Sequence, residues 1–316
     1  MINPKSNGNS SKSRLQTMLE SGIFAVTAEC GPPQGVNLEV VAEKAEYLKG
    51  KVDAVNVTDN QTAIIRMSSI SVALYLLQSG IEPVMQIVCR DRNRIAIQSD
   101  LLGAGGWGIK NVLCLSGDHQ QFGKNSMAKN VYDMDSIQLL QVVRAMRDDR
   151  RLSCGSEIAG QPVFFIGAAA NPFADPFMFR VLRLEKKALA GANFIQTQCI
   201  FNVEKFERFM VEVRKLGLHE RLFILAGVTP FKSLGMAKYM KTKVPGMDVP
   251  DALIERMQQA PKEAKAEEGI KICVETIQRM KEIPGVAGIH LMAIEWEQKV
   301  PEILERAGLL PRPKVI

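Results

Sequence analysis

The chain has 316 residues, of which 46% are hydrophobic and 23% charged, and 40 Lys and Arg against 34 Asp and Glu give a net charge of +6. This composition excludes intrinsic disorder, and no run of about eighteen apolar residues is present to span a membrane. The positive charge forms no basic block or stripe. It therefore fits an anionic small molecule or an acidic partner protein and argues against nucleic-acid binding.

The first thirteen residues are polar and lack the apolar core of a signal peptide. We therefore expect residues 1–13 to form a flexible tail on a cytoplasmic protein. No linker or change of composition divides the rest of the chain. Residues 14–316 are accordingly predicted to form a single domain.

Within that domain, a short β-branched run, a polar turn and a segment of helical periodicity recur eight times. Eight such units in about 300 residues favour an α/β fold of one (β/α)8 TIM barrel. A doubly wound open sheet is the alternative, because periodicity does not distinguish closed from open parallel sheets. The predicted strands are Ile23–Glu29, Val52–Thr58, Pro83–Cys89, Lys110–Ser116, Pro162–Ala168, Phe194–Gln198, Arg221–Gly227 and Gly288–Ala293.

One glycine-rich segment imitates a cofactor loop. Gly103–Gly108 satisfies the dinucleotide-binding pattern G-x-G-x-x-G. That pattern requires a strand before the glycines and a helix after them, whereas these glycines follow a predicted helix, Ile95–Leu102, and precede a strand. We interpret them as a helix stop and turn.

Metal chemistry has little support in the sequence. The six cysteines are scattered with no C-x-x-C pair, and the three histidines show no ligand spacing. This argues against a zinc site, a disulfide framework and an iron–sulfur cluster held by local cysteines. No metal site is expected.

In a barrel the active site lies at the carboxyl ends of the strands. Glu29 closes an apolar strand, where a general acid of raised pKa and a salt-bridged or helix-capping carboxylate are equally consistent with its position. Asp118 follows Gly117, so a turn residue is the alternative to a functional carboxylate. Of Gln196 and Gln198, we expect one to face inward, where it would suit a heterocyclic amide ligand.

Five motifs stand in register with this barrel, and together they resemble the methylenetetrahydrofolate reductase family. The resemblance runs from about Leu15 to Leu310. The motifs are Ala28-Glu29-Cys30-Gly31-Pro32-Pro33, Asn56-Val57-Thr58-Asp59-Asn60, Leu113-Cys114-Leu115-Ser116-Gly117-Asp118, Ala169-Ala170-Asn171-Pro172 and Gly191-Ala192-Asn193-Phe194-Ile195-Gln196-Thr197-Gln198.

The resemblance implies a flavin-dependent barrel that reduces 5,10-methylenetetrahydrofolate to 5-methyltetrahydrofolate in one-carbon metabolism. Glu29 matches the family's general acid, which protonates the departing folate nitrogen while flavin N5 gives the hydride. Asp118 matches the carboxylate near flavin and folate, and Gln198 matches the glutamine that grips the substrate. The cofactor contacts so implied are Thr58, Gln86, Gly117, Asp118, Tyr132, Ala169, Asn171 and Lys187.

The chain departs from this pattern around the outer part of the cofactor. Well-known bacterial members carry His, Arg and Tyr where this chain has Gln86, Ser116 and Asn171, and His and Asp where it has Asp175 and Arg180. The reaction centre thus matches while the contacts to the flavin tail do not. FMN and FAD both remain open.

The electron donor is a further open point. Some members use NADH or NADPH directly, and others work with an iron–sulfur partner subunit. In NADH-using members the cofactor packs on an aromatic side chain after strand seven; the matching residue here is Leu234, with Phe231 as a substitute three residues earlier. We expect the partner subunit as donor and direct use of NADH or NADPH to be weaker.

Other functions remain open beside this one. A pterin-binding barrel can handle methyl groups without redox chemistry, and a non-catalytic subunit of such a complex would show the same fold. An aldolase-type barrel is disfavoured, because no predicted strand has a central lysine to form a Schiff base.

Overall fold

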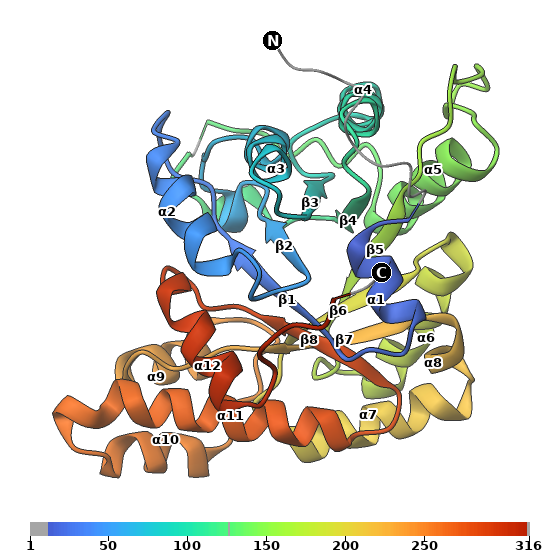
Figure 1. Cartoon of the computed structure of the whole chain (residues 1–316). Helices are drawn as coiled ribbons and strands as arrows, with labels where there is room; N and C mark the ends of the chain where they lie inside the picture. The colour runs from blue at the N-terminus through green and yellow to red at the C-terminus, as the bar shows by residue number, and fades with distance from the viewer. Residues whose placement is uncertain (1–11, 126, 315–316) are drawn as a thin grey trace.

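The computed structural model describes residues 12–125 and 127–314. Eight parallel strands close into a barrel in sequence order, with β8 paired back to β1 (Figure 1). The predicted (β/α)8 TIM barrel is confirmed, and each strand lies within three residues of its predicted bounds. The strands are β1 (Ala25–Cys30), β2 (Ala54–Val57), β3 (Pro83–Val88), β4 (Asn111–Leu115), β5 (Phe165–Ala170), β6 (Phe194–Cys199), β7 (Phe223–Val228) and β8 (Val286–Leu291).

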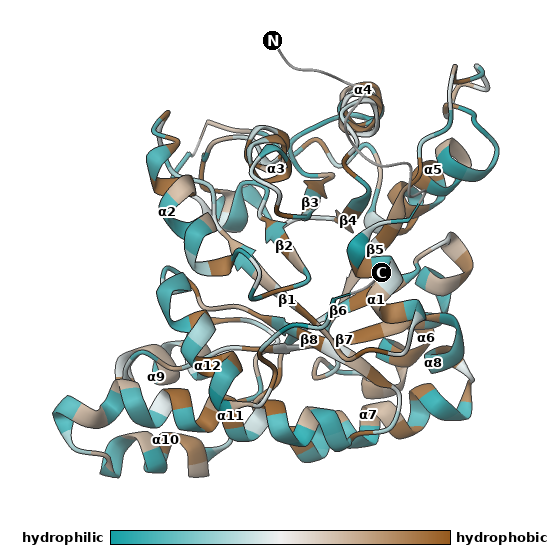
Figure 2. Cartoon of the chain, viewed as in Figure 1, coloured by the Kyte–Doolittle hydropathy of each residue, from teal (hydrophilic) through white to brown (hydrophobic). Residues whose placement is uncertain are grey.

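Helices surround the barrel, and hydrophobic residues concentrate along the strands while hydrophilic ones cover the outer helices and loops (Figure 2). In the described part of the chain, no helix has the length and apolar character needed to cross a membrane. The helices are α1 (Arg14–Glu20), α2 (Glu39–Leu48), α3 (Ser69–Gln78), α4 (Arg94–Gly106), α5 (Ser136–Asp148), α6 (Phe177–Ala190), α7 (Val203–Lys215), α8 (Leu218–Arg221), α9 (Leu234–Lys243), α10 (Asp251–Gln259), α11 (Lys265–Glu282) and α12 (Val300–Arg306). Short 3-10 helices are η1 (Gln61–Ala63), η2 (Gln120–Phe122), η3 (Lys262–Ala264) and η4 (Glu297–Lys299).

The amino end of the barrel is closed by apolar side chains. Leu15 and Leu19 of α1 pack against inward-facing residues of the first seven strands, among them Phe165 and Phe194, whose rings stack at 5.1 Å. A Cβ on Gly167 would lie 2.2 Å from the Phe194 ring, so glycine is needed for this ring to fill the barrel. Because this end is filled, a ligand can enter the barrel only at the carboxyl end.

An ion pair fastens the chain beneath this floor. Asp53 is fully buried, and Arg312 donates to both of its carboxylate oxygens at 2.6 and 3.2 Å. The amide of Val26 also donates to Asp53, at 2.8 Å, and Arg14 approaches it at 3.3 Å. The last described segment is thereby held against the starts of β1 and β2.

The structure differs from the sequence predictions at the N-terminal tail and at the glycine-rich segment. Ser13 is 1% exposed and its hydroxyl caps α1, so it belongs to the folded domain, whereas residues 1–11 lie outside the described residues. The sequence predicted a helix that ends at Leu102. Helix α4 instead continues to Gly106, and the chain turns at Gly108 with a φ of +88°. Within the helix, a Cβ on Gly105 would lie 3.3 Å from the Phe164 ring. The predicted turn is therefore present at Gly108, whereas the predicted helix stop is wrong, because Gly105 lies inside α4 and permits close packing there.

Replacing Arg312 by Met is expected to lower the free energy of unfolding by about 3 kcal/mol, because it leaves the buried Asp53 carboxylate with one weaker partner. Urea denaturation measures the change. Arg279→Met, which removes an exposed ion pair with Glu207, is the matched control and should change nothing measurable. Equal effects of both substitutions would contradict a special role of the buried pair.

Candidate active site

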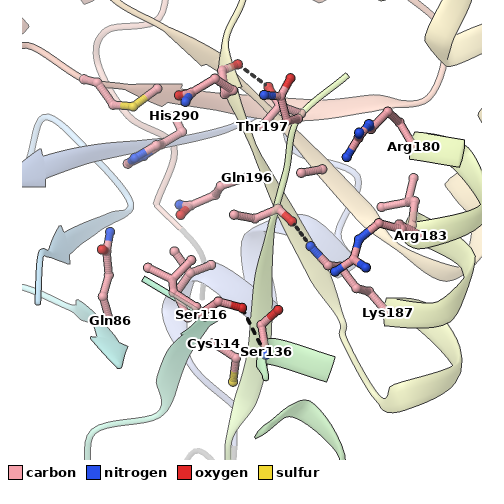
Figure 3. Close-up of a pocket in the computed structure, with 18 of the residues that line it drawn as sticks. Gln86, Cys114, Ser116, Ser136, Arg180, Arg183, Lys187, Gln196, Thr197 and His290 are labelled. Atoms are coloured by element: carbon pink, nitrogen blue, oxygen red, sulfur yellow. Dashed lines mark hydrogen bonds between the residues drawn. The ribbon is translucent and has the colours of Figure 1, made fainter. Parts of the chain in front are cut away.

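A cavity of about 390 Å³ opens at the carboxyl ends of the strands, between the barrel and α6 (Figure 3). Glu29 lies on its wall together with His290, and Arg180 and Arg183 of α6 lie on it as well. Six of the ten predicted site residues line it: Glu29, Gln86, Ala169, Asn171, Lys187 and Gln198.

Glu29 is the acid of this cavity. Its side chain is 10% exposed, and burial, followed by the negative charge of Glu297, raises its pKa to about 7. Lys44, a hydrogen bond from Gln61 and Arg66 oppose this rise. A carboxyl with such a pKa is a proton donor near neutral pH.

Beneath Glu29 lies a buried polar network. The Gln196 amide donates to Asn56 at 2.9 Å and to the Thr27 hydroxyl at 3.1 Å, and Asn56 donates to the Gln196 oxygen at 2.6 Å. The Thr27 hydroxyl lies 2.9 Å from Nδ1 of His290, and Nε2 of His290 lies 3.9 Å from Glu29. Burial lowers the pKa of His290 to about 3, so its ring is neutral. Either the Thr27 hydroxyl or Nδ1 can donate in this contact, so it holds the position of the His290 ring and does not fix which nitrogen carries the proton.

The other part of the cavity is cationic. Arg180, Arg183 and Lys187 project from α6 toward it (Figure 3). Arg180 donates to the main-chain oxygens of Ala174 and Asp175, and Lys187 to that of Ala169. Burial, followed by the charge of Arg183, lowers the pKa of Lys187 to about 8.

None of these three cations forms an ion pair with a carboxylate of the described residues. Their charges are therefore available to an anion that enters the cavity.

The remaining predicted residues do not line the cavity but lie in loops and strand ends beside it. Gly117 has a φ of +85°, and a Cβ there would lie 3.1 Å from Arg90, so this position requires glycine. Tyr132 donates to the Gly117 carbonyl at 3.0 Å, and the buried Arg90 donates to the Asp118 carbonyl at 3.1 Å. The turn that carries Asp118 is thus fixed through its backbone.

Thr58 is the fourth predicted residue that does not line the cavity, and it directly follows β2. It is 1% exposed, and its hydroxyl has no hydrogen-bond partner among the described residues. A buried hydroxyl without a partner is costly, which marks this position as one that a bound polar group would satisfy.

The expectation for the two glutamines was wrong. Gln196 and Gln198 both line the cavity, since residues two apart on a strand point to the same face. Gln196 is satisfied by protein partners deep in the barrel, whereas Gln198 lies nearer the mouth, where its side-chain oxygen accepts from Cys199 N at 3.2 Å. Gln198 therefore remains the candidate for substrate contact.

Sequence reasoning missed two residues of the cavity. His290 was set aside because no ligand spacing surrounds it, and Arg183 was not considered. The spacing of Arg180, Arg183 and Lys187 at i, i+3 and i+7 on one helix face was a signal for a cationic wall. No comparable local signal marks His290.

Comparison with known proteins gives the family. Residues 14–308 match the family described as methylenetetrahydrofolate reductase. The chain belongs to this family. Its relatives include a probable methylenetetrahydrofolate reductase (NADPH) of Caenorhabditis elegans, 24% identical over 77% of this chain and 35% of its own length. Another is methylenetetrahydrofolate reductase 2 of Schizosaccharomyces pombe, 27% identical over 78% of this chain and 39% of its own length. The chain thus spans little more than a third of these methylenetetrahydrofolate reductases.

A solved structure supports the barrel fold of this chain. An uncharacterised protein of Clostridium thermocellum, described as binding two copies of 5-methyl-5,6,7,8-tetrahydrofolic acid, superimposes with a TM-score of 0.62. The match covers 94% of this chain and 99% of that chain at 15% identity. The described residues hold no cluster of three His, Cys, Asp or Glu side chains that could bind a metal ion.

Glu29 is expected to titrate near pH 7 in the folded protein, because burial and Glu297 both disfavour its charged form. Infrared difference spectra across a pH series report the carboxyl, and the signal is assigned by its loss in Glu29→Gln. A midpoint near that of an exposed glutamate, about 4.3, would contradict the environment described for it.

Proposed function

We propose that this chain reduces 5,10-methylenetetrahydrofolate to 5-methyltetrahydrofolate with a bound flavin. The observation that carries the proposal is the buried Glu29 on the wall of a cavity whose other part is cationic. Membership of the family and the folate-binding neighbour support the substrate class. A non-catalytic subunit would have no need for a protonated acid at this place.

The residues of the chain fit a flavin and a folate. When bound, the flavin supplies the hydride. Glu29 holds a proton for the folate nitrogen that leaves when the methylene bridge opens, and the neutral His290 favours the carboxylate that remains. Gln198 orients the pterin, and Asp118 places a negative charge where positive charge develops.

The polar groups around the cavity suit the cofactor. The amides of Gln86 and Asn171 line the cavity with Ala169 and would meet the polar edge of the flavin ring, whereas Thr58, Gly117 and Tyr132 lie behind this lining and would support it. Arg180 and Arg183 stand where the phosphate end would lie, close to Lys187. We propose FMN, because two guanidinium groups without carboxylate partners suit a terminal phosphate dianion better than the diester of FAD.

Substitution of Glu29 by Gln should leave flavin binding intact and reduce folate turnover about a hundred- to ten-thousandfold, since an amide keeps the shape but donates no acidic proton. Flavin content and the folate-dependent reoxidation of chemically reduced enzyme measure the two effects. Glu295→Gln, at an exposed carboxylate after β8, is the control and should behave as wild type. Wild-type turnover by Glu29→Gln would remove this residue from the mechanism.

The choice of flavin can be tested by reconstitution. Protein stripped of its flavin should bind FMN more tightly than FAD and riboflavin, and Arg183→Met should weaken FMN about ten- to hundredfold, as the loss of one charge-assisted hydrogen bond predicts. Riboflavin, which lacks the phosphate, serves as the control and should bind the variant as well as the wild type. Equal loss for riboflavin would contradict phosphate binding at this place.

The electron donor is proposed to be an iron–sulfur partner subunit. Phe231, the aromatic residue that could replace the one on which the nicotinamide packs, is fully buried and stacks on Phe201 at 4.5 Å. Neither Phe231 nor Leu234 lines the cavity. No Phe, Tyr or Trp belongs to the cavity lining in the described residues. The six cysteines are free and form no cluster site, so the cluster is assigned to another chain.

NADH should therefore bleach the flavin of the isolated chain slowly, while a small one-electron donor such as reduced methyl viologen does so rapidly. An aromatic contact is worth about 0.5–1.5 kcal/mol, and its absence weakens nicotinamide binding up to about tenfold. Stopped-flow mixing with each donor, followed at the flavin absorbance, measures the two rates of flavin reduction. Fast, saturable bleaching by NADH would contradict the partner proposal.

A further inference from the structure

A second cavity, of about 360 Å³, lies between the loop after β1 and the segment after β8. Lys44 of α2, Glu297 of η4 and Gly31 of the loop after β1 are among the residues that line it. Nζ of Lys44 is 2.7 Å from Oε1 of Glu297, and the two side chains are 19% and 6% exposed. The cavity therefore borders a mostly buried ion pair that joins two segments far apart in the sequence.

The pair also holds the segment that carries Glu29. Nζ of Lys44 donates to the carbonyl of Gly31, two residues after Glu29, at 3.3 Å. Helix α2, the loop after β1 and η4 are thus tied together by one ammonium group. A buried ion pair contributes little net stability compared with apolar side chains of similar size, so stability alone is a weak reason for its presence here.

The charged groups around Glu29 are few. The groups that face it are Glu297 of η4, Lys44 of α2, Arg66 and Gln61 of the segment after β2, His290 of β8, the adjacent Cys30, and Cys199 of β6. Burial raises the pKa of both cysteine thiols to about 12 and lowers the pKa of His290 to about 3, so these three are uncharged at neutral pH. Among the described residues, the formal charges that act on Glu29 are therefore those of Glu297, Lys44 and Arg66. Glu297 is the one anion among them.

We propose that the Lys44–Glu297 pair is a positioning device for Glu29, in which Glu297 holds Lys44 against the backbone after the acid and adds a negative charge beside the buried carboxyl. The inference rests on the proposed role of Glu29 as general acid. Glu297 touches no reacting atom and acts through Glu29 alone.

The test uses the flavin-loaded protein and two measurements over a pH series. The first is the infrared titration of the Glu29 carboxyl, and the second is the rate at which 5,10-methylenetetrahydrofolate reoxidises chemically reduced flavin. In Glu297→Gln the amide still accepts from Lys44, but the negative charge is gone and the cation is unopposed. The midpoint of Glu29 should fall by about one pH unit, the size typical of one nearby charge.

The direction of the rate effect follows from the proton balance. Glu29 is active when protonated, so the rate falls as the pH rises through its pKa, and a lower pKa moves that fall to lower pH. Glu297→Asp retains the charge and should restore the wild-type midpoint. Glu302→Gln, an exposed acid on the neighbouring α12, is the matched control and should leave both curves unchanged.

A merely structural role would lower the rate at every pH without moving the midpoint, and an unmoved or raised midpoint in Glu297→Gln overturns the proposal. Should Glu297→Gln not fold, Lys44→Gln removes the cation, keeps an amide that can donate to the Gly31 carbonyl, and leaves the charge of Glu297 unopposed. Its Glu29 midpoint should rise, and an unchanged or lowered one overturns the proposal. Wild-type folate turnover by Glu29→Gln would contradict the proposed function. The infrared titration tests the role of Glu297 independently, because it requires no turnover.

Discussion

A carboxyl group withdrawn from water keeps its proton unless a cation or hydrogen-bond donors stabilise its anion, and the chemistry of this barrel depends on that constraint. Glu29 is the second-last residue of the buried strand β1, and burial is the largest influence on its pKa. His290, 3.9 Å away, is held neutral by the same burial, and its Nδ1 contacts the network of Thr27, Gln196 and Asn56. The remainder of the site is built around an acid that the surrounding protein leaves uncharged.

The closed barrel makes this environment durable. The apolar floor below the polar network prevents water from reaching Glu29 from the amino end, and the cavity wall formed by α6 is positively charged. Acid and cations are thus displayed on separate parts of one cavity. A ligand with an electron-poor ring system and an anionic tail is oriented by this arrangement before any specific contact forms.

Much of the fold was predictable from the sequence, because each strand and helix carries its own periodicity. The limits of β3 differ by one residue from the prediction, whereas β5 begins three residues later than expected, at Phe165 instead of Pro162. Helix α4 runs through glycines that locally favour a helix end, because the absence of a side chain at Gly105 lets the helix pack closely against Phe164. Tertiary contact overrides local preference in such places.

Site residues that belong to a sequence motif could be predicted, whereas contacts between segments far apart in the sequence could not. Glu29, Asn171 and Gln198 belong to the motifs of the sequence, and the structure brings all three to one cavity. Lys44 and Glu297 stand near opposite ends of the chain, and only closure of β8 against β1 brings them together. Phe231 illustrates the reverse error, because its place in the sequence suggested a ligand contact while its ring is buried against Phe201.

The ion pair beneath the floor has a practical consequence. Arg312 and Arg14 meet at Asp53, and Arg14 also donates to the carbonyl of Pro313, so the first and last described segments leave the fold side by side at the barrel's amino end (Figure 1). Residues 12 and 314, the outermost described positions, therefore lie on the side of the barrel opposite the cavity mouth. A surface linker attached at a described position near either of them would direct the cavity toward the solution.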